Sequence, residues 1–321
     1  MEHGRRYLLI SPCRDEAEFI RRTLDSVAAQ STPPALWLVV DDGSTDATPA
    51  ILEEYARKLP YLKVLRRGDR GRRAVGPGVI EAFYAGLETV QLDQFDYLCK
   101  LDVDLDLPPR YFELLIERME ADPRLGSCSG KPHFHAADGS LVPEALGDEM
   151  SVGMTKFYRV ACFQEIGGFV RQVMWDGIDC HRSRMLGWRV QAFRDEPLRF
   201  LHLRPMGTSQ KGIWTGRVRY GFGQYFMGTS PLFFVASALS RIPKFPFLVG
   251  TAAMLWGYLS SAARRLPRYD DLEFRRFLRR YQRRSLVMGK RKAAALATEE
   301  RAGVWRERHP AAGASVRVRP G

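Results

Sequence analysis

Short, mostly apolar runs alternate with amphipathic stretches along the first third of the chain. The runs are four or five residues long, as is typical of strands buried in a parallel sheet. They occupy positions 7–11, 36–40, 62–65 and 97–101. Between them, apolar residues recur every three or four positions, which is helical spacing. Strands that alternate with helices predict an α/β domain with a mainly parallel sheet and crossover helices.

Polar clusters follow three of these runs, at positions 12–16, 41–46 and 102–106. Ligands of such sheets bind beyond the carboxyl ends of the strands. Because all three clusters fall at those ends, we expect a binding site there.

Carboxylates dominate two of the clusters, with Asp41 and Asp42 in one and Asp102, Asp104 and Asp106 in the other. Side chains at i and i+2 of an extended segment leave from the same face, so Asp102 and Asp104 can share a ligand. Crowded carboxylates repel each other unless a cation is present, and Mg²⁺ or Mn²⁺ prefers oxygen ligands. Ordinary helix-capping aspartates are the alternative that this pattern leaves open.

At this point the sequence resembles family 2 glycosyltransferases. Residues 39–46, Val-Val-Asp-Asp-Gly-Ser-Thr-Asp, look like the nucleotide-binding signature of that family, and residues 101–104, Leu-Asp-Val-Asp, look like its Asp-X-Asp metal motif. Residues 12–16 are similar to its opening Pro-X-X-Asn-Glu, with Asp15 in place of Asn. The resemblance runs from about Tyr7 to about His202, nearly two thirds of the chain.

The resemblance implies a GT-A fold that binds a nucleotide-sugar, most often a UDP-sugar. It implies Asp104 as a ligand of Mn²⁺ or Mg²⁺. Related enzymes sometimes use a histidine at the position of His202 as a further ligand of the metal or the diphosphate, and a structural role of this lone histidine is the alternative. Asp41 would accept a hydrogen bond from the uracil, and Asp102 would lie near the ribose or the sugar. The nucleotide-sugar would be bound by Pro12, Arg14, Glu16, Asp41, Asp42, Ser44 and Asp102. The basic segment 66–73 lies either near the diphosphate or in a solvated loop.

The catalytic base of the family is the Asp of a Glu-Asp pair, and this chain departs from that pattern. The spacing after Gly167-Gly168-Phe169 favours Asp176, which follows Trp175 instead of Glu. Asp179 is the alternative base, and a helix N-cap is the alternative role of Asp176. The Gln-X-X-Arg-Trp signature of processive synthases is not evident, and residues 210–214 resemble it only weakly. We therefore expect transfer of one sugar at a time.

Two apolar stretches, 231–240 and 246–263, follow the resembling region. The first is too short to span a bilayer and the second is at the lower limit. Gly, Ser and Pro lower the apolar character of both stretches, so we predict half-inserted or interfacial helices. A buried helical pair that closes the main domain is the alternative.

Positive charge is concentrated at the end of the chain. The sequence has 49 Lys and Arg and 37 Asp and Glu, a net charge of +12. Residues 264–321 hold 17 of the basic and 6 of the acidic residues. Such a tail suits an anionic membrane surface or nucleic acid, and the preceding apolar stretches favour the membrane. We predict a GT-A domain over 1–210, a membrane-associating helical region over 211–265, and a basic, helical, partly disordered tail over 266–321.

The predicted function is an inverting glycosyltransferase that acts on a hydroxyl of a glycan or a lipid-linked acceptor, in surface polysaccharide or glycolipid synthesis. Five scattered cysteines favour a reducing compartment, and the apolar run at 7–10 is too short for a signal peptide. We therefore expect a cytoplasmic protein at the inner face of the cell membrane. The alternatives are a sugar nucleotidyltransferase, although residues 11–16 hold no Gly-rich loop, and a basic protein that binds nucleic acid or membranes; no nucleic-acid partner is expected.

Overall fold

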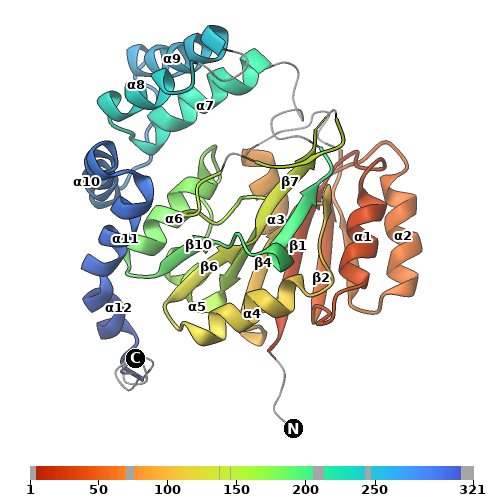
Figure 1. The fold of residues 1–321 in the computed structure, drawn as a ribbon. Coiled ribbons are helices and arrows are strands. Elements are labelled where there is room, and N and C mark those ends of the chain that lie inside the picture. The colour runs from red at the N-terminus through yellow and green to blue at the C-terminus, as the bar shows by residue number, and fades with distance from the viewer. Residues whose placement is uncertain are drawn as a thin grey trace.

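The computed structural model describes residues 5–69, 76–136, 138–144, 146–204, 213–242 and 247–311. An α/β domain forms the body of the molecule (Figure 1). A layer of helices lies beside it, and the last helices of the chain run along one flank of the domain. Some of the predictions above fall on residues 70–75, 210–212 and 312–321, which lie outside the described residues.

The central sheet has seven strands in the order β10-β6-β9-β4-β1-β2-β3. Their bounds are Tyr7–Cys13 (β1), Leu36–Asp41 (β2), Leu62–Arg66 (β3), Tyr97–Leu101 (β4), Leu125–Ser129 (β6), Thr155–Arg159 (β9) and Arg189–Ala192 (β10). Strand β9 runs antiparallel to both of its neighbours, and all other pairs are parallel. The mainly parallel α/β sheet and its first four strands are therefore confirmed.

Helices cover both faces of this sheet. They are Ile20–Ala28 (α1), Thr48–Lys58 (α2), Pro77–Leu87 (α3), Tyr111–Ala121 (α4), Val160–Glu165 (α5) and Trp175–Met185 (α6). Alternate residues of a strand point to opposite faces. Tyr7 and Leu9 accordingly share one core with α1, α2 and α4, whereas Leu8 and Ile10 share the other with α3, α5 and α6. This three-layer arrangement leaves the carboxyl ends of β1, β2 and β4 at one edge.

A second sheet of four strands, in the order β5-β11-β7-β8, adjoins that edge. Its strands are Leu105–Asp106 (β5), Lys131–His135 (β7), Leu141–Pro143 (β8) and Arg199–His202 (β11). Two short 3₁₀ helices, Leu92–Gln94 (η1) and Glu196–Leu198 (η2), lie in connections. The backbone N–H of Leu203 donates to the carbonyl of Asp104 at 2.9 Å. The small sheet thus brings the end of β11 to the end of β4.

Six helices complete the described chain, namely Ile213–Met227 (α7), Pro231–Leu239 (α8), Phe247–Ala263 (α9), Leu272–Met288 (α10), Lys290–Glu300 (α11) and Ala302–Arg308 (α12). Glycines allow α7 and α9 to approach closely. A Cβ on Gly221 would lie 2.1 Å from the carbonyl oxygen of Met254, and one on Gly257 would lie 2.1 Å from that of Val218. Within the described residues, no helix has the length and apolar character needed to cross a membrane.

The basic region packs back onto the α/β domain. The rings of Trp188 and Trp305 are 5.7 Å apart, and Arg124 donates to the carbonyl of Thr298 at 3.1 Å. The predicted helical character of this region is therefore present over 272–308, in three helices. The predicted domain limits at 210 and 265 remain predictions.

Candidate active site

The carboxyl ends of β1, β2 and β4 lie side by side, because β1 pairs with both other strands. Cys13 is in register with Asp41, and Ile10 with Lys100. The ends of these strands and the segments that follow them hold Pro12, Arg14, Glu16, Asp41, Asp42, Ser44, Asp102 and Asp104. The structure brings all of these predicted site residues to one edge of the sheet.

Side-chain hydrogen bonds join the loop after β1 to the loop after β2. Asp41 Oδ1 accepts from the backbone N–H of Ser44 at 2.9 Å, and the Ser44 hydroxyl oxygen accepts from the N–H of Asp15 at 2.9 Å. Asp15 has a φ of 52°, a left-handed conformation that Asp and Asn tolerate best among non-glycine residues. Its Oδ1 accepts from the N–H of Thr45 at 2.8 Å. Asp15 thus supplies the acceptor and the backbone shape expected of the Asn it replaces.

Arginines neutralise Asp42 and its neighbourhood. Arg67 Nη1 lies 2.7 Å from Asp42 Oδ1. Arg14 donates to the carbonyl of Asp42 at 3.1 Å and to Asp69 Oδ1 at 2.6 Å. The part of the basic segment that the structure describes therefore lies against the nucleotide-signature loop. Its other arginines, at positions 70, 72 and 73, lie outside the described residues.

Asp104 lies at the centre of a buried polar network. Arg204 contacts both Asp104, at 3.2 Å, and Glu16. His202 Nε2 lies 3.7 Å from Asp104 Oδ2, and His202 Nδ1 donates to Glu144 Oε1 at 2.6 Å. Neither Arg204 nor Glu144 was identified from the sequence. Of the two, only Arg204 could have been found there, because it stands two residues after His202 on an extended segment, so that the two side chains lie on the same face.

Electrostatics hold a proton on His202. Burial lowers the pKa of its imidazole, but the hydrogen bonds to Asp104 and Glu144 outweigh burial and raise the pKa to about 9. Burial raises the pKa of Asp104, and His202 and Arg204 more than compensate, so that the pKa of Asp104 lies below its ordinary value. The positive charges of His202 and Arg204 therefore stabilise the Asp104 carboxylate.

The donor atoms around Asp104 fit a divalent metal ion that is shared with a ligand. A carboxylate and an imidazole face each other, and Glu144 orients the second nitrogen of the imidazole, as carboxylates do for metal-bound histidines. The described residues contain no group of three or more His, Cys, Asp or Glu arranged to hold a metal ion. A metal held by Asp104 and His202 would share its remaining positions with a substrate and water, which is the usual arrangement for Mg²⁺.

Asp176 stands in the first turn of α6, with its carboxylate half-buried beside Gly153. A Cβ on Gly153 would lie 3.1 Å from Asp176 Oδ2, and the Gly153 carbonyl accepts from Lys100 Nζ at 3.1 Å. Lys100 also pairs with Asp102, so Asp176 lies close to the Asp-X-Asp segment. The cap position of α6 belongs to Met174, so Asp176 does not have the N-cap role considered above. Within the described residues, no donor contacts its carboxylate.

Asp179 has a different environment. Its oxygens lie 2.7 and 2.6 Å from Lys156 Nζ and accept from the hydroxyl of Tyr158, and its side chain is 1% exposed. The ion pair links β9 to α6 across the buried face of the helix. Every described contact of the Asp179 carboxylate is thus internal to the fold.

Trp175, the residue that departs from the family pattern, faces two lysines. Lys100 Nζ lies 5.3 Å and Lys156 Nζ 5.8 Å from its ring centre, within the range of cation–π attraction. The ring also packs on Phe169 at 4.7 Å. Neither lysine was identified from the sequence, because each stands in an apolar strand where burial of a cation gives no local signal.

Comparisons with known proteins bear on the family and the fold. The sequence model described as Glycosyl transferase family 2 matches residues 9–144. Poly-beta-1,6-N-acetyl-D-glucosamine synthase of Staphylococcus epidermidis is 27% identical over 234 residues, which are 66% of this chain and 52% of that protein. The chain therefore spans about half the length of this relative.

Solved glycosyltransferases share the fold. S. aureus TarS 1–349 in complex with UDP superposes with a TM-score of 0.52 at 16% identity, over 95% of this chain and 91% of that one. Mannosyltransferase PcManGT of Pyrobaculum calidifontis, in complex with GDP-Man and Mn²⁺, gives 0.50 at 21% identity, over 92% and 86%. The α/β fold with a mixed sheet and C-terminal helices is thus GT-A-like.

Proposed function

We propose, from the premise that this chain belongs to glycosyltransferase family 2, that it transfers a sugar from a nucleotide-sugar to a hydroxyl group with inversion. The observation that carries the proposal is the convergence of Asp41, Asp102 and Asp104 at one sheet edge, with the Asp176 carboxylate close by and without a described donor.

The donor is a UDP-sugar. Asp41 is buried and uses Oδ1 for the Ser44 N–H, and its second oxygen accepts from the imide N–H of uracil. Asp102, whose side chain is about one-third exposed, lies beside the ribose or the sugar. Support comes from solved structures of TarS 1–349, which bind UDP and UDP-GlcNAc. Pro12, Arg14, Glu16, Asp42 and Ser44 shape the same pocket.

A divalent metal assists the reaction. Asp104 and His202 would hold Mn²⁺ or Mg²⁺, which when bound neutralises the charge that develops on the leaving diphosphate. His202 must then give up its proton, because a metal ligand binds through a neutral imidazole. Arg204 keeps Asp104 ionised and adds a second positive charge beside the site.

Asp176 is the general base. It accepts the proton of the acceptor hydroxyl while the oxygen attacks the anomeric carbon, and the bond from that carbon to the diphosphate breaks on the opposite face. The electron pair of the broken bond leaves with UDP, so atoms and charge balance. Asp179 positions α6 through Lys156.

The acceptor is a glycan or a lipid-linked molecule, used in synthesis of a surface polysaccharide or glycolipid at the inner face of the membrane. The similarity to poly-beta-1,6-N-acetyl-D-glucosamine synthase supports this class. So do apolar side chains on α8 and α9: Leu232, Leu248, Trp256 and Leu259 are exposed by 70%, 66%, 62% and 60%. An apolar surface of this kind marks an interaction site.

The test is release of UDP from a panel of UDP-sugars by the purified protein, in the presence of Mn²⁺ and of membrane extract as acceptor source. We expect one sugar to be turned over well above the rest, with sugar incorporated into the extract. Turnover of no UDP-sugar, together with turnover of a sugar phosphate and a nucleoside triphosphate, would overturn the proposal in favour of a nucleotidyltransferase.

A further inference from the structure

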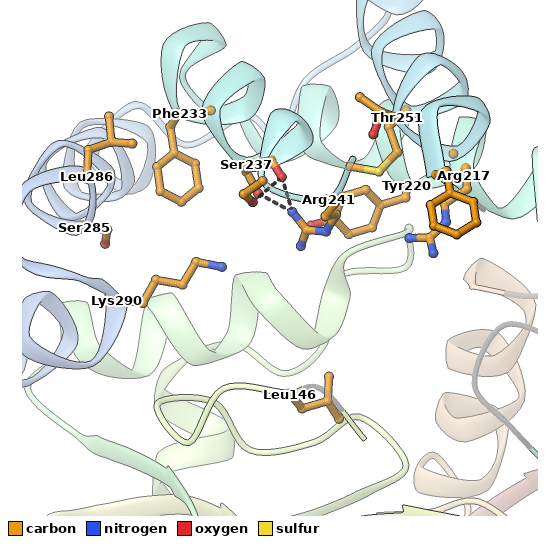
Figure 2. A pocket seen from close by; sticks show the side chains of 15 residues that line it. Leu146, Arg217, Tyr220, Phe233, Ser237, Arg241, Thr251, Ser285, Leu286 and Lys290 are labelled. Atoms are coloured by element: carbon orange, nitrogen blue, oxygen red, sulfur yellow. Dashed lines mark hydrogen bonds between the residues drawn. The ribbon is translucent and has the colours of Figure 1, made fainter. Parts of the chain in front are cut away.

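A cavity of about 690 Å³ lies between the helical layer and the α/β domain, apart from the donor residues. It is lined by α7, by α8 and the residues after it, by α9, and by the junction of α10 and α11, with Leu146 on the opposite side (Figure 2). Its volume is within the range of small-molecule sites. The proposed function makes no use of it.

Among the described residues, three cations and no carboxylate line this cavity. Arg217, Arg241 and Lys290 come from three separate segments of the chain. Figure 2 shows the ends of Arg241 and Lys290 extending into the same space. Within the described residues neither Arg217 nor Arg241 forms an ion pair with an acidic side chain. The positive charge of Arg217 and Arg241, which no described carboxylate balances, favours an anion, and Lys290 adds a third positive charge to the lining.

Arg241 is held in place for such a role. It donates to the carbonyl oxygen of Ser237 at 2.7 Å and to the hydroxyl of the same residue, and its guanidinium lies 5.6 Å from the ring centre of Tyr220. The hydroxyls of Ser237 and Ser240 lie on the same wall, where Ser237 accepts from Arg241 and Ser240 donates to the Ser237 carbonyl at 2.9 Å. A planar guanidinium fixed in this way suits the oxygens of a phosphate group.

The remaining lining is apolar and continues toward the exposed helices. Phe233, Met254 and Leu286 line the cavity, and Phe247, which lines it from α9, is 57% exposed. The exposed apolar residues of α8 and α9 described above belong to the same two helices. A ligand here therefore meets both cationic groups and an apolar wall that leads to the exposed apolar side chains of α8 and α9.

We propose that this cavity binds a phosphate-bearing lipid, with its phosphate at Arg217, Arg241 and Lys290 and its chains along Phe233 and Met254. A free phosphate ion would use the cations and leave the apolar wall without a partner. The site goes beyond the proposed function and does not depend on it, because none of these residues belongs to the donor cluster.

The test is lipid binding by the full chain, measured by native mass spectrometry in detergent. Phosphatidylglycerol is titrated against inorganic phosphate and against diacylglycerol with the same chains. We expect one phosphatidylglycerol per chain, bound about tenfold or more tightly than either probe. Inorganic phosphate that competes as strongly as the lipid, or diacylglycerol that binds as tightly, would overturn the proposal.

Variants locate the binding. Arg241→Gln with Lys290→Gln should weaken phosphatidylglycerol binding by about tenfold or more. Arg264→Gln with Arg265→Gln removes the same charge from exposed positions and should change it by less than about twofold. Equal losses of phosphatidylglycerol binding in the two double variants would contradict a site in the cavity. Ala236→Trp fills the apolar part without a change in charge and should also block the lipid; unaltered binding would contradict the site.

UDP-dependent thermal stabilisation, measured on the same preparations, separates the two proposals. Cavity variants that keep the UDP response and lose lipid support the site. Wild-type protein that responds to UDP but binds no lipid overturns the cavity proposal alone. Protein that binds lipid but not UDP overturns the proposed function alone.

Discussion

Glu144 and His202 face each other at 2.6 Å, from Oε1 to Nδ1, although they stand far apart in the sequence. Together with Asp104 on the other side of the ring, Glu144 raises the pKa of His202 from its ordinary value of 6.5 to about 9. Glu144, which would orient a metal-bound His202, and Asp104, which would share the metal with it, thus hold a proton on the imidazole when no metal is bound.

This ion pair makes stability depend on pH. A group whose pKa is raised on folding stabilises the fold fully below its unfolded pKa, and the stabilisation is lost as the pH rises through the folded pKa. Without metal, the free energy of unfolding of wild type should therefore fall relative to His202→Asn between about pH 6.5 and about pH 9, by on the order of 3 kcal/mol.

Urea unfolding at several pH values measures this difference. His135, exposed at the end of β7, offers a matched control, because His135→Asn should leave the pH profile of wild type unchanged. If the unfolding free energies of wild type and His202→Asn change in parallel with pH, the ion pair contributes nothing to the pH dependence of stability.

Asp176 and Asp179 should respond oppositely to removal of charge. Asp179→Asn leaves the buried ammonium of Lys156 without its counter-charge and should cost about 3–5 kcal/mol of unfolding free energy. Asp176→Asn, at a half-buried carboxylate with no described donor, should change stability by less than about 0.5 kcal/mol. Denaturant titration of both variants measures the two changes in the free energy of unfolding. Comparable losses in the two variants would contradict the different roles of Asp176 and Asp179.

Loss of the base should stop transfer and spare donor binding. Asp176→Asn should lower the transfer rate by about 10²–10⁴-fold, the usual contribution of a general base, with the affinity for UDP unchanged. Rate and affinity are measured on the same preparation. An active Asp176→Asn enzyme would require another base.

Membrane association should depend on the exposed face of α9. Leu248→Ser with Leu259→Ser removes two apolar side chains and should lower partition into phosphatidylglycerol vesicles by about tenfold or more. Leu272→Ser with Val287→Ser removes two exposed apolar side chains from α10 that do not line the cavity, and serves as control. Cosedimentation measures the partition, and equal losses for the two pairs would contradict a surface on α9.

The sequence predicts the first four strands and their polar ends because both are local patterns. Each of these strands is a short apolar run. Asp41 ends one of them, and Asp102 and Asp104 lie just after another. The partners of these side chains are not local. Glu144 reaches His202 and Arg204 reaches Glu16 through pairings between distant segments, which no spacing along the chain encodes.

Two further features depend on tertiary packing. Strand β9 is antiparallel and carries the buried Lys156, whose charge hides the strand from an apolar pattern and is balanced only by Asp179 of α6. The basic region was predicted to be helical from its charge and spacing. Its attachment through Trp188 and Trp305 depends on two aromatic residues more than a hundred positions apart.

The central claim, a donor site at Asp104 that is completed by a metal, is tested most directly by thermal unfolding with UDP, with Mn²⁺ and with both. We predict a rise in Tm that requires both ligands in wild type and disappears in Asp104→Asn. A rise with UDP alone that Mn²⁺ does not increase, or an unchanged response of Asp104→Asn, would contradict the claim.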